Sequence, residues 1–228
     1  MIDVGANYRR IREHVAEIAR RCGRQPEDIT IVCAAKTKGP EFIRAALAAG
    51  ATVIGENYVQ EAREKIAHIS EPATWHLIGH LQRNKAKDAI QLFSLIHSLD
   101  NIALAKELQR QCAKRSRTIR TLIEVNLGGE QTKSGIASDQ LDALLATMSE
   151  CPNVRVEGFM TIPPPDPEAE ASRPYFHALA RLREQYARSR AENIDLRELS
   201  MGMTDDYPVA IEEGATIVRI GRAIFGER

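Results

Sequence analysis

Residues 29–38 read Ile-Thr-Ile-Val-Cys-Ala-Ala-Lys-Thr-Lys, a short apolar run that is rich in β-branched side chains and is followed by two lysines. A strand buried on both faces of a parallel sheet has this composition. The first strand of a doubly wound open sheet is normally followed by a glycine-rich GxGxxG turn, whereas Lys36-Thr37-Lys38 follows here. The segment therefore favours a closed barrel over an open sheet.

Further apolar runs continue along the chain, with amphipathic helix-forming stretches between them. The predicted strands are residues 29–35, 52–55, 75–79, 94–99, 121–126, 154–162, 196–201 and 216–220, and the predicted helices are residues 8–21, 40–49, 59–66, 101–116, 138–149, 173–190 and 208–214. Parallel strands need helical crossovers, and eight strands alternating with helices over about this length is the pattern of a (β/α)8 barrel. We expect an α/β fold in which residues 1–228 form a single TIM-barrel domain, with the doubly wound sheet as the alternative.

The composition excludes several classes of protein. The 31 Lys and Arg residues balance 31 Asp and Glu residues, so no global charge favours nucleic acid or an acidic membrane surface. The apolar runs are far shorter than the roughly 18 residues of a membrane-spanning helix, and no apolar core of a signal peptide follows the first Met. The 4 cysteines form no CxxC pair, which is typical of a reduced compartment. We expect a cytoplasmic protein without nucleic-acid or membrane partners.

Lys36 is the first candidate for chemistry, because the working end of such a barrel lies where the strands finish. With a period of two, Val32, Ala34 and Lys36 share one face of the strand. If this face lines the barrel, burial disfavours the charged ammonium form of the lysine. A neutral amine is the form that condenses with an aldehyde. The alternative is a lysine that leaves the strand for solvent.

Arg219 lies within the otherwise apolar strand at residues 216–220. In a closed barrel this last strand neighbours the first, so Arg219 and Lys36 are expected at the same mouth. A buried guanidinium needs an acceptor. Either a carboxylate such as Glu124 or a ligand can supply it.

Glycines follow both of the last two predicted strands, where barrels of this kind often hold phosphate. The two loops read Ser200-Met201-Gly202-Met203-Thr204 and Gly221-Arg222-Ala223-Ile224-Phe225-Gly226. Glycine lets the backbone approach a ligand, and free N–H groups at a helix start bind phosphate. The alternative is that these glycines only form tight turns.

Polar residues also follow the second and third predicted strands. Asn57 can donate a hydrogen bond to a ligand oxygen, and His76 and His80 straddle a strand end without metal-ligand spacing.

Seven motifs, in this order and over nearly the whole chain, resemble the pyridoxal-phosphate homeostasis protein family, single-domain relatives of the alanine racemase N-terminal barrel. They are residues 36–38 (Lys-Thr-Lys), 55–61 (Gly-Glu-Asn-Tyr-Val-Gln-Glu), 75–85 (Trp-His-Leu-Ile-Gly-His-Leu-Gln-Arg-Asn-Lys), 133–135 (Lys-Ser-Gly), 157–161 (Glu-Gly-Phe-Met-Thr), 200–206 (Ser-Met-Gly-Met-Thr-Asp-Asp) and 218–226 (Val-Arg-Ile-Gly-Arg-Ala-Ile-Phe-Gly). Thr204 stands where the family more often has serine, and it keeps the hydroxyl.

The resemblance implies a cofactor site for pyridoxal 5′-phosphate (PLP). It implies that Lys36 holds the cofactor as an internal aldimine and that Arg219 faces the pyridine nitrogen. It places Asn57 near the ring and makes Met201 and Met203 part of the pocket wall. It also places the phosphate at Ser200, Gly221 and Arg222, with Arg222 contributing through its backbone.

An arginine at the pyridine nitrogen disfavours a pyridinium and mutes carbanion chemistry. A racemase also needs a second acid or base, and neither Tyr58 nor Tyr207 matches that role; we expect no second domain to supply one. We therefore expect a non-catalytic PLP carrier that acts in vitamin B6 and amino-acid homeostasis and delivers the cofactor to apo-forms of PLP enzymes, and the resemblance implies a monomer. The alternatives are a fold-type III amino-acid racemase with Lys36 as base, and a barrel that binds another phosphorylated metabolite. Lys38, Lys85 and Lys133 are further candidates to capture the aldehyde.

Overall fold

The computed structural model describes residues 2–130, 134–187 and 191–227. Its strands are all parallel and form a closed barrel in sequence order, β1 to β8, with β8 pairing back onto β1. The strands are β1 (Thr30–Ala34), β2 (Val53–Glu56), β3 (Thr74–Leu77), β4 (Leu95–Leu99), β5 (Ile119–Glu124), β6 (Val154–Met160), β7 (Ile194–Ser200) and β8 (Ile217–Ile220). The predicted (β/α)8 barrel is confirmed.

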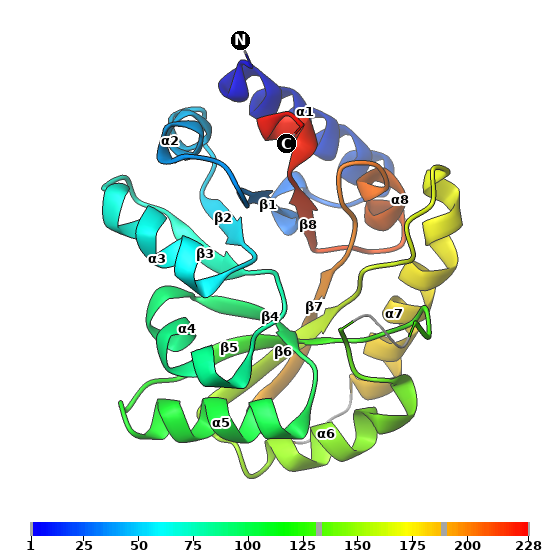
Figure 1. Ribbon diagram of the computed structural model, residues 1–228. Coiled ribbons are helices and arrows are strands. Elements are labelled where there is room, and N and C mark those ends of the chain that lie inside the picture. The colour runs from blue at the N-terminus through cyan, green and yellow to red at the C-terminus, as the bar shows by residue number, and fades with distance from the viewer. Residues whose placement is uncertain (1, 131–133, 188–190, 228) are drawn as a thin grey trace.

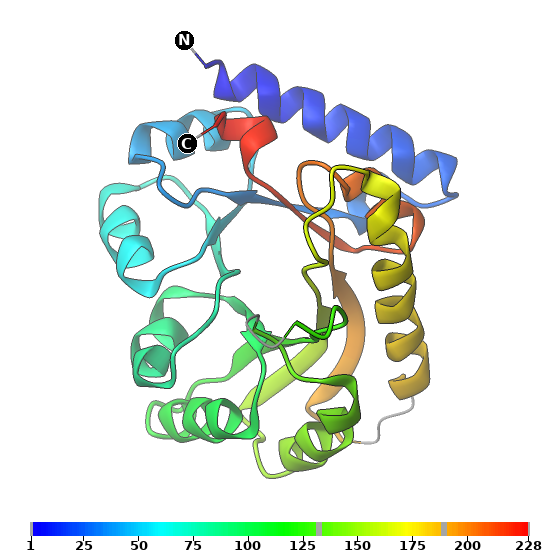
Figure 2. The ribbon, with the colours of Figure 1, turned by 45° about the vertical axis from the view of Figure 1, so that its right-hand side comes forward.

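Helices surround the barrel and cover its outer face (Figures 1 and 2). They are α1 (Val4–Arg21), α2 (Pro40–Ala48), α3 (Val59–His68), α4 (Ala86–Leu92), α5 (Ile102–Ala113), α6 (Leu141–Met148), α7 (Arg173–Tyr186), α8 (Tyr207–Glu212) and α9 (Arg222–Phe225), with 3-10 turns at Pro26–Asp28, Arg83–Lys85, Ser138–Gln140 and Ala169–Ser172. Helix α1 precedes the barrel and packs against α9, so the two ends of the chain lie side by side in Figure 1.

All seven predicted helices are present, and two short ones were missed. Helix α1 begins at Val4 rather than at residue 8, because the Asp3 side chain accepts a hydrogen bond from Ala6 N and caps the helix. Helix α4 has 7 residues, too few for a clear apolar period. Helix α9 has 4 residues and lies in the glycine-containing segment that was interpreted as a loop.

Two apolar layers hold the barrel together. The inner cluster fills the space inside the strands and consists of Val32, Val53, Ile78, Leu95, Leu122, Met160 and Ile217, with Ala34 packed against it. A much larger cluster fills the space between the strands and the helices. The inner cluster fills the barrel interior below its C-terminal mouth, which is where barrels of this kind hold their ligands.

Strands β6 and β7 approach each other closely at Gly158. This residue pairs with Glu198, next to a register irregularity that follows Val156. A Cβ on Gly158 would lie 1.9 Å from Glu198 O and 2.6 Å from Glu198 C. The glycine of the predicted motif at residues 157–161 therefore serves strand packing.

None of the helices in the described ranges has the length and apolar character needed to span a membrane. The 4 cysteines are free thiols, and Cys22 is the exposed one.

Candidate functional site

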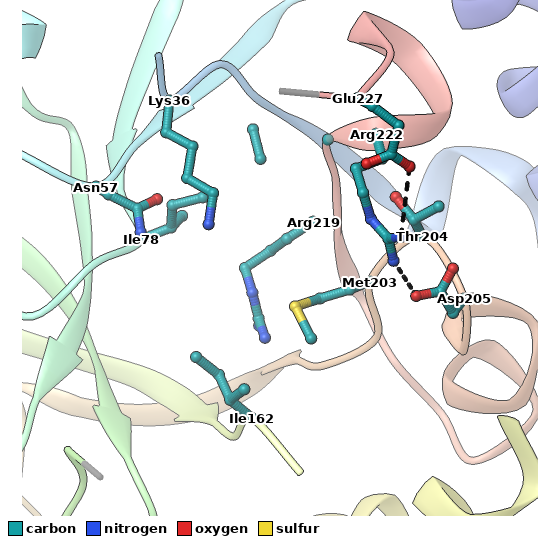
Figure 3. Close-up of a pocket in the computed structure, with 12 residues that line it drawn as sticks. Lys36, Asn57, Ile78, Ile162, Met203, Thr204, Asp205, Arg219, Arg222 and Glu227 are labelled. Atoms are coloured by element: carbon teal, nitrogen blue, oxygen red, sulfur yellow. Dashed lines mark hydrogen bonds and ion pairs between the residues drawn. The ribbon is translucent and has the colours of Figure 1, made fainter. Parts of the chain in front are cut away.

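A cavity of about 520 Å³ opens at the C-terminal ends of the strands, a size typical of small-molecule sites (Figure 3). The residues that line it are Ala34, Lys36, Asn57, Ile78, Ile162, Met203, Thr204, Asp205, Arg219, Gly221, Arg222 and Glu227. They come from opposite sides of the barrel, so the cavity exists only when the barrel is closed.

Lys36 follows β1 and extends into this cavity. Val32 belongs to the inner cluster, Ala34 packs against it and also lines the cavity, and Lys36 continues the same face upward. Lys36 and Arg219 extend into the same space in Figure 3. The closed barrel explains this, because Val32 on β1 pairs with Arg219 on β8. The predicted placement of both side chains at one mouth is confirmed.

Arg219 is almost completely buried, with 4% of its surface exposed. Its Nη1 donates to Ser200 O at 2.8 Å and to Ser200 Oγ at 2.7 Å, and its Nη2 donates to Thr161 O at 2.9 Å. Burial lowers the pKa of Arg219 to about 10, while the charges of Glu124 and Asp206 oppose this shift. In the described chain Glu124 acts on Arg219 at a distance, and the ends of β6 and β7 supply the acceptors.

A buried hydrogen-bonded chain extends from Arg219 across the barrel. The Ser200 hydroxyl accepts from Arg219 and also forms a hydrogen bond with His97 Nδ1 at 2.9 Å. His97 Nε2 in turn forms a hydrogen bond with His76 Nδ1 at 3.1 Å. Burial lowers the pKa of His76 to about 3 and that of His97 well below its ordinary value. Both imidazoles are therefore neutral and fix the orientation of the Ser200 hydroxyl.

Sequence reasoning did not select His97. It lies in the middle of a wholly buried strand, β4. The signal that could have identified His97 is a polar residue inside an apolar run, which is the signal that identified Arg219.

Arg222, Gly221 and Thr204 form the opposite end of the cavity. The Arg222 side chain hydrogen-bonds to the Asp205 carboxylate and forms an ion pair with Glu227 at 3.6 Å (Figure 3). The guanidinium of Arg222 is therefore paired with two carboxylates, and its backbone forms the first residue of α9. Ala223 N points to Thr204 Oγ1 at 3.4 Å, and a Cβ on Gly221 would lie 3.3 Å from Ala34 O. Gly221 and Arg222 border the cavity at this end.

The comparison with protein-family models matches residues 6–228 to the alanine racemase N-terminal domain. The chain belongs to this family. Among curated members, it is 45% identical to the pyridoxal phosphate homeostasis protein of Aquifex aeolicus (strain VF5), over 96% of each chain. It is 39% identical to the protein of the same name from Escherichia coli (strain K12), over 100% of this chain and 98% of the other.

Solved structures of the family agree with the fold. PipY of Synechococcus elongatus PCC7942, with PLP bound, has a TM-score of 0.82 and 35% sequence identity and covers 93% of this chain and 100% of its own. Alanine racemase from Corynebacterium glutamicum has a TM-score of 0.72 at 17% identity, and the match covers 99% of this chain but 61% of the racemase. The second likeness shows the shared barrel alone.

The structure brings six of the eight predicted site residues to the cavity wall and places two outside it. Lys36, Asn57, Met203, Arg219, Gly221 and Arg222 line the cavity, whereas Ser200 and Met201 do not. Ser200 is fully buried and supports Arg219 from below. Met201 is fully buried in the outer apolar layer. Contrary to the expectation, its side chain is therefore not part of the cavity wall. It follows Ser200, and alternate residues at a strand end point to opposite faces.

Asn57 reaches the cavity through a close backbone contact. A Cβ on Gly79 would lie 2.5 Å from Asn57 O and 2.7 Å from Asn57 Cα. Glycine at residue 79 therefore lets the ends of β2 and β3 pack together behind Asn57.

Four other side chains considered in the sequence do not line the cavity, namely Lys38, Lys85, Tyr58 and Tyr207. Lys38 Nζ donates to Glu227 O at 2.7 Å, and Lys85 Nζ donates to Gln60 Oε1 at 3.2 Å. Tyr58 is 65% exposed, whereas Tyr207 is buried and bonded to His14. Lys133 is outside the described residues. Within the described ranges, no group of three or more His, Cys, Asp or Glu residues is arranged to hold a metal ion.

The buried acid Glu124 gives the site a measurable pH dependence. Burial, with help from Asp100, raises the pKa of Glu124 from its ordinary 4.5 to about 7, while Arg219 opposes the shift. Between pH 4.5 and 7 the folded state therefore holds a proton that the unfolded state releases, and the free energy of unfolding gains from Glu124 as pH falls. A Glu124→Gln variant lacks this gain, which is about 1.4 kcal/mol per pH unit. Urea unfolding at pH 7 and 4.5 should show the variant weakening relative to the unaltered protein as pH falls.

Two histidines change the free energy of unfolding in the opposite direction, in the Glu124→Gln variant and in the unaltered protein alike. His76 and His97 are neutral when folded, so protonation of the unfolded chain weakens the fold below pH 6.5. Comparing variant with parent removes this shared contribution. A Glu64→Gln variant on the exposed face of α3 is the control and should track the parent. If the free energy of unfolding changed with pH equally in Glu124→Gln and in the parent, the raised pKa of Glu124 would be contradicted.

Proposed function

We propose that this chain binds pyridoxal 5′-phosphate reversibly at the barrel mouth and serves the intracellular homeostasis of the cofactor without catalysing a reaction of its own. The observation that carries the proposal is Arg219, fixed by three hydrogen bonds in the cavity that Lys36 enters. The names of the curated relatives and the PLP-bound PipY structure support it.

The residues of the cavity fit this cofactor. PLP supplies an aldehyde carbon that condenses with a primary amine and releases water. Lys36 would provide the amine, and Arg219 would face the pyridine nitrogen. Asn57 and Met203 would border the ring. The phosphate would lie at Gly221 and Arg222, which line the cavity at the start of α9.

Arg219 is also the main argument for a carrier rather than a racemase. A carboxylate beside the pyridine nitrogen keeps that nitrogen protonated and makes the ring an electron sink. A guanidinium cannot accept this proton and repels a pyridinium. The two carboxylates that line the cavity, Asp205 and Glu227, both interact with Arg222. Neither is therefore set as a second acid or base beside Lys36. The alternative function is a fold-type III racemase in which Lys36 is the base.

The proposed role includes the protein's partners and form. The chain would act as a monomeric, single-domain cytoplasmic protein whose ligand is PLP and whose partners are apo-forms of PLP enzymes. Met203 and Ile162 line the cavity and are 38% and 39% exposed. The cavity therefore opens to the surface, as reversible loading and release require.

Borohydride reduction of the PLP-loaded protein, followed by peptide mass mapping, tests this proposal. Reduction converts a C=N bond into a stable secondary amine on the lysine that carried it. We expect the adduct at Lys36, its loss in Lys36→Ala, and its retention in the neighbouring control Lys38→Ala. An adduct spread over Lys38, Lys85 and Lys133, or no uptake at all, would overturn the proposal. Exchange of the α-proton of an amino acid into solvent by the loaded protein would instead establish the racemase.

A further inference from the structure

A cluster of three charged side chains, two buried and one partly exposed, lies behind the turn that carries Lys36. Glu56 ends β2, and Glu61 and Lys65 lie on α3. The side chain of Lys65 is 8% exposed, that of Glu56 is 0% exposed and that of Glu61 is 24% exposed. The cluster is separate from the cavity wall, because none of the three residues lines the cavity.

The ammonium group of Lys65 uses all of its hydrogens within this cluster. Nζ donates to Ala35 O at 2.7 Å, to Glu56 Oε1 at 2.6 Å and to Glu61 Oε1 at 2.6 Å. An ammonium has three hydrogens, and each has an acceptor here. It therefore acts as a fixed cross-link between β1, β2 and α3.

The cluster holds both chain neighbours of Lys36. Lys65 holds the carbonyl of Ala35, and Glu61 Oε1 accepts from Thr37 N at 2.6 Å. Thr37 has a φ of +64°, a conformation that a β-branched residue adopts only at a cost in free energy. The surrounding contacts must supply that cost, and the bond from Glu61 is one that reaches this residue directly.

The energetics indicate a geometric role for the cluster. Buried ion pairs contribute little net stability, since desolvation offsets their attraction. Glu56 Oε2 is buried and has no hydrogen-bond partner in the described part of the chain. Burial raises the pKa of Glu56 to about 7, against the hydrogen bond and charge of Lys65. What the cluster does provide is a fixed position for residues 35–37 and for Asn57, which follows Glu56.

We propose that Glu61 and Lys65 are positioning residues that hold Ala35 O and Thr37 N and so aim Lys36 at the aldehyde of the ligand. This inference rests on the proposed function, and it adds residues that neither touch the cofactor nor line its cavity. Misplacing a reacting group by about 1 Å costs up to about a hundredfold in rate. Loosening the turn should therefore lower the rate of PLP capture strongly, while the free energy of unfolding changes little.

Glu61 is the residue to change, because removing Lys65 would leave two carboxylates without a cation. Glu61→Ala removes the acceptor of Thr37 N, while Glu61→Gln keeps a side-chain oxygen at the same reach. Glu64→Ala is the matched control, an exposed glutamate on the same helix. We expect Glu61→Ala to slow the absorbance change of PLP capture by about ten- to hundredfold. Glu61→Gln should restore most of the rate, and Glu64→Ala should match the parent.

Two further measurements keep the outcomes distinct. Borohydride mapping of the parent establishes whether Lys36 captures the aldehyde at all, and failure there concerns the proposed function and not Glu61. With Lys36 labelled in the parent, equal capture rates for Glu61→Ala and Glu64→Ala would overturn the positioning role. Amide hydrogen exchange of the unaltered protein needs no variant: the Thr37 amide should be protected, and exchange as fast as in an open turn would also overturn the inference.

Discussion

A Gly158→Ala variant is expected to lose more than about 4 kcal/mol of its free energy of unfolding, at the extreme of single substitutions. The added Cβ would lie 1.9 Å from the carbonyl oxygen of Glu198, an atom of the neighbouring strand's backbone. A backbone atom within a paired strand cannot rotate away, so β6 and β7 would have to separate. Urea unfolding followed by circular dichroism measures the loss directly.

Gly23→Ala is the control for this substitution. Gly23 has a φ of +70°, and a Cβ there would have nothing within 4 Å. Alanine at residue 23 should cost only the local strain of that conformation, about 1–2 kcal/mol. Similar losses for the two variants would show that the contact with Glu198 relaxes easily.

Gly158 also affects the site, because the two strands that it lets pack together, β6 and β7, lead to the acceptors of Arg219. Thr161 follows β6 and Ser200 ends β7, and their carbonyl oxygens accept from Arg219. Separating β6 from β7 would move these two acceptors apart. A partly folded Gly158→Ala protein should therefore lose PLP capture before it loses its secondary structure.

An Arg219→Met variant is expected to raise the pKa of the bound cofactor's ring nitrogen by about three units. Two unit charges about 4 Å apart interact by about 4 kcal/mol at an effective dielectric constant of about 20, and 1.36 kcal/mol corresponds to one unit. The buried guanidinium opposes a second positive charge on the ring, and methionine does not. The measurement is the ¹⁵N chemical shift of ring-labelled PLP as a function of pH.

Arg222→Met separates this effect from the general loss of a positive charge. Arg222 lines the same cavity, but its side chain is paired with Asp205 and Glu227. The ring nitrogen should titrate in Arg222→Met as it does in the parent. An unchanged titration in Arg219→Met would place Arg219 away from the ring nitrogen and remove the main argument against the racemase.

The positions of the strands and of Lys36 and Arg219 were predictable because they depend on local pattern. The apolar run at residues 29–35, the period of two through Val32, Ala34 and Lys36, and the single arginine within residues 216–220 are all visible in the sequence. Closure of the barrel then brings Lys36 and Arg219 together, since the last strand must pair with the first.

Tertiary structure alone decided which neighbours those side chains have. The sequence suggested a carboxylate such as Glu124, or a ligand, as the partner of Arg219. In the structure, the carbonyl oxygens of Ser200 and Thr161, 19 and 58 residues away in the chain, accept hydrogen bonds from it. Met201 belongs to the outer apolar layer, because the face on which a strand-end residue lies depends on where the pairing stops. Glu56 and Glu61 lie in the motif at residues 55–61, but their contact with Lys65 behind Lys36 is visible only in the folded chain. Hydrophobic periodicity is a local property and specifies strands and barrel, whereas a buried polar contact depends on register between distant segments, which only the folded chain fixes.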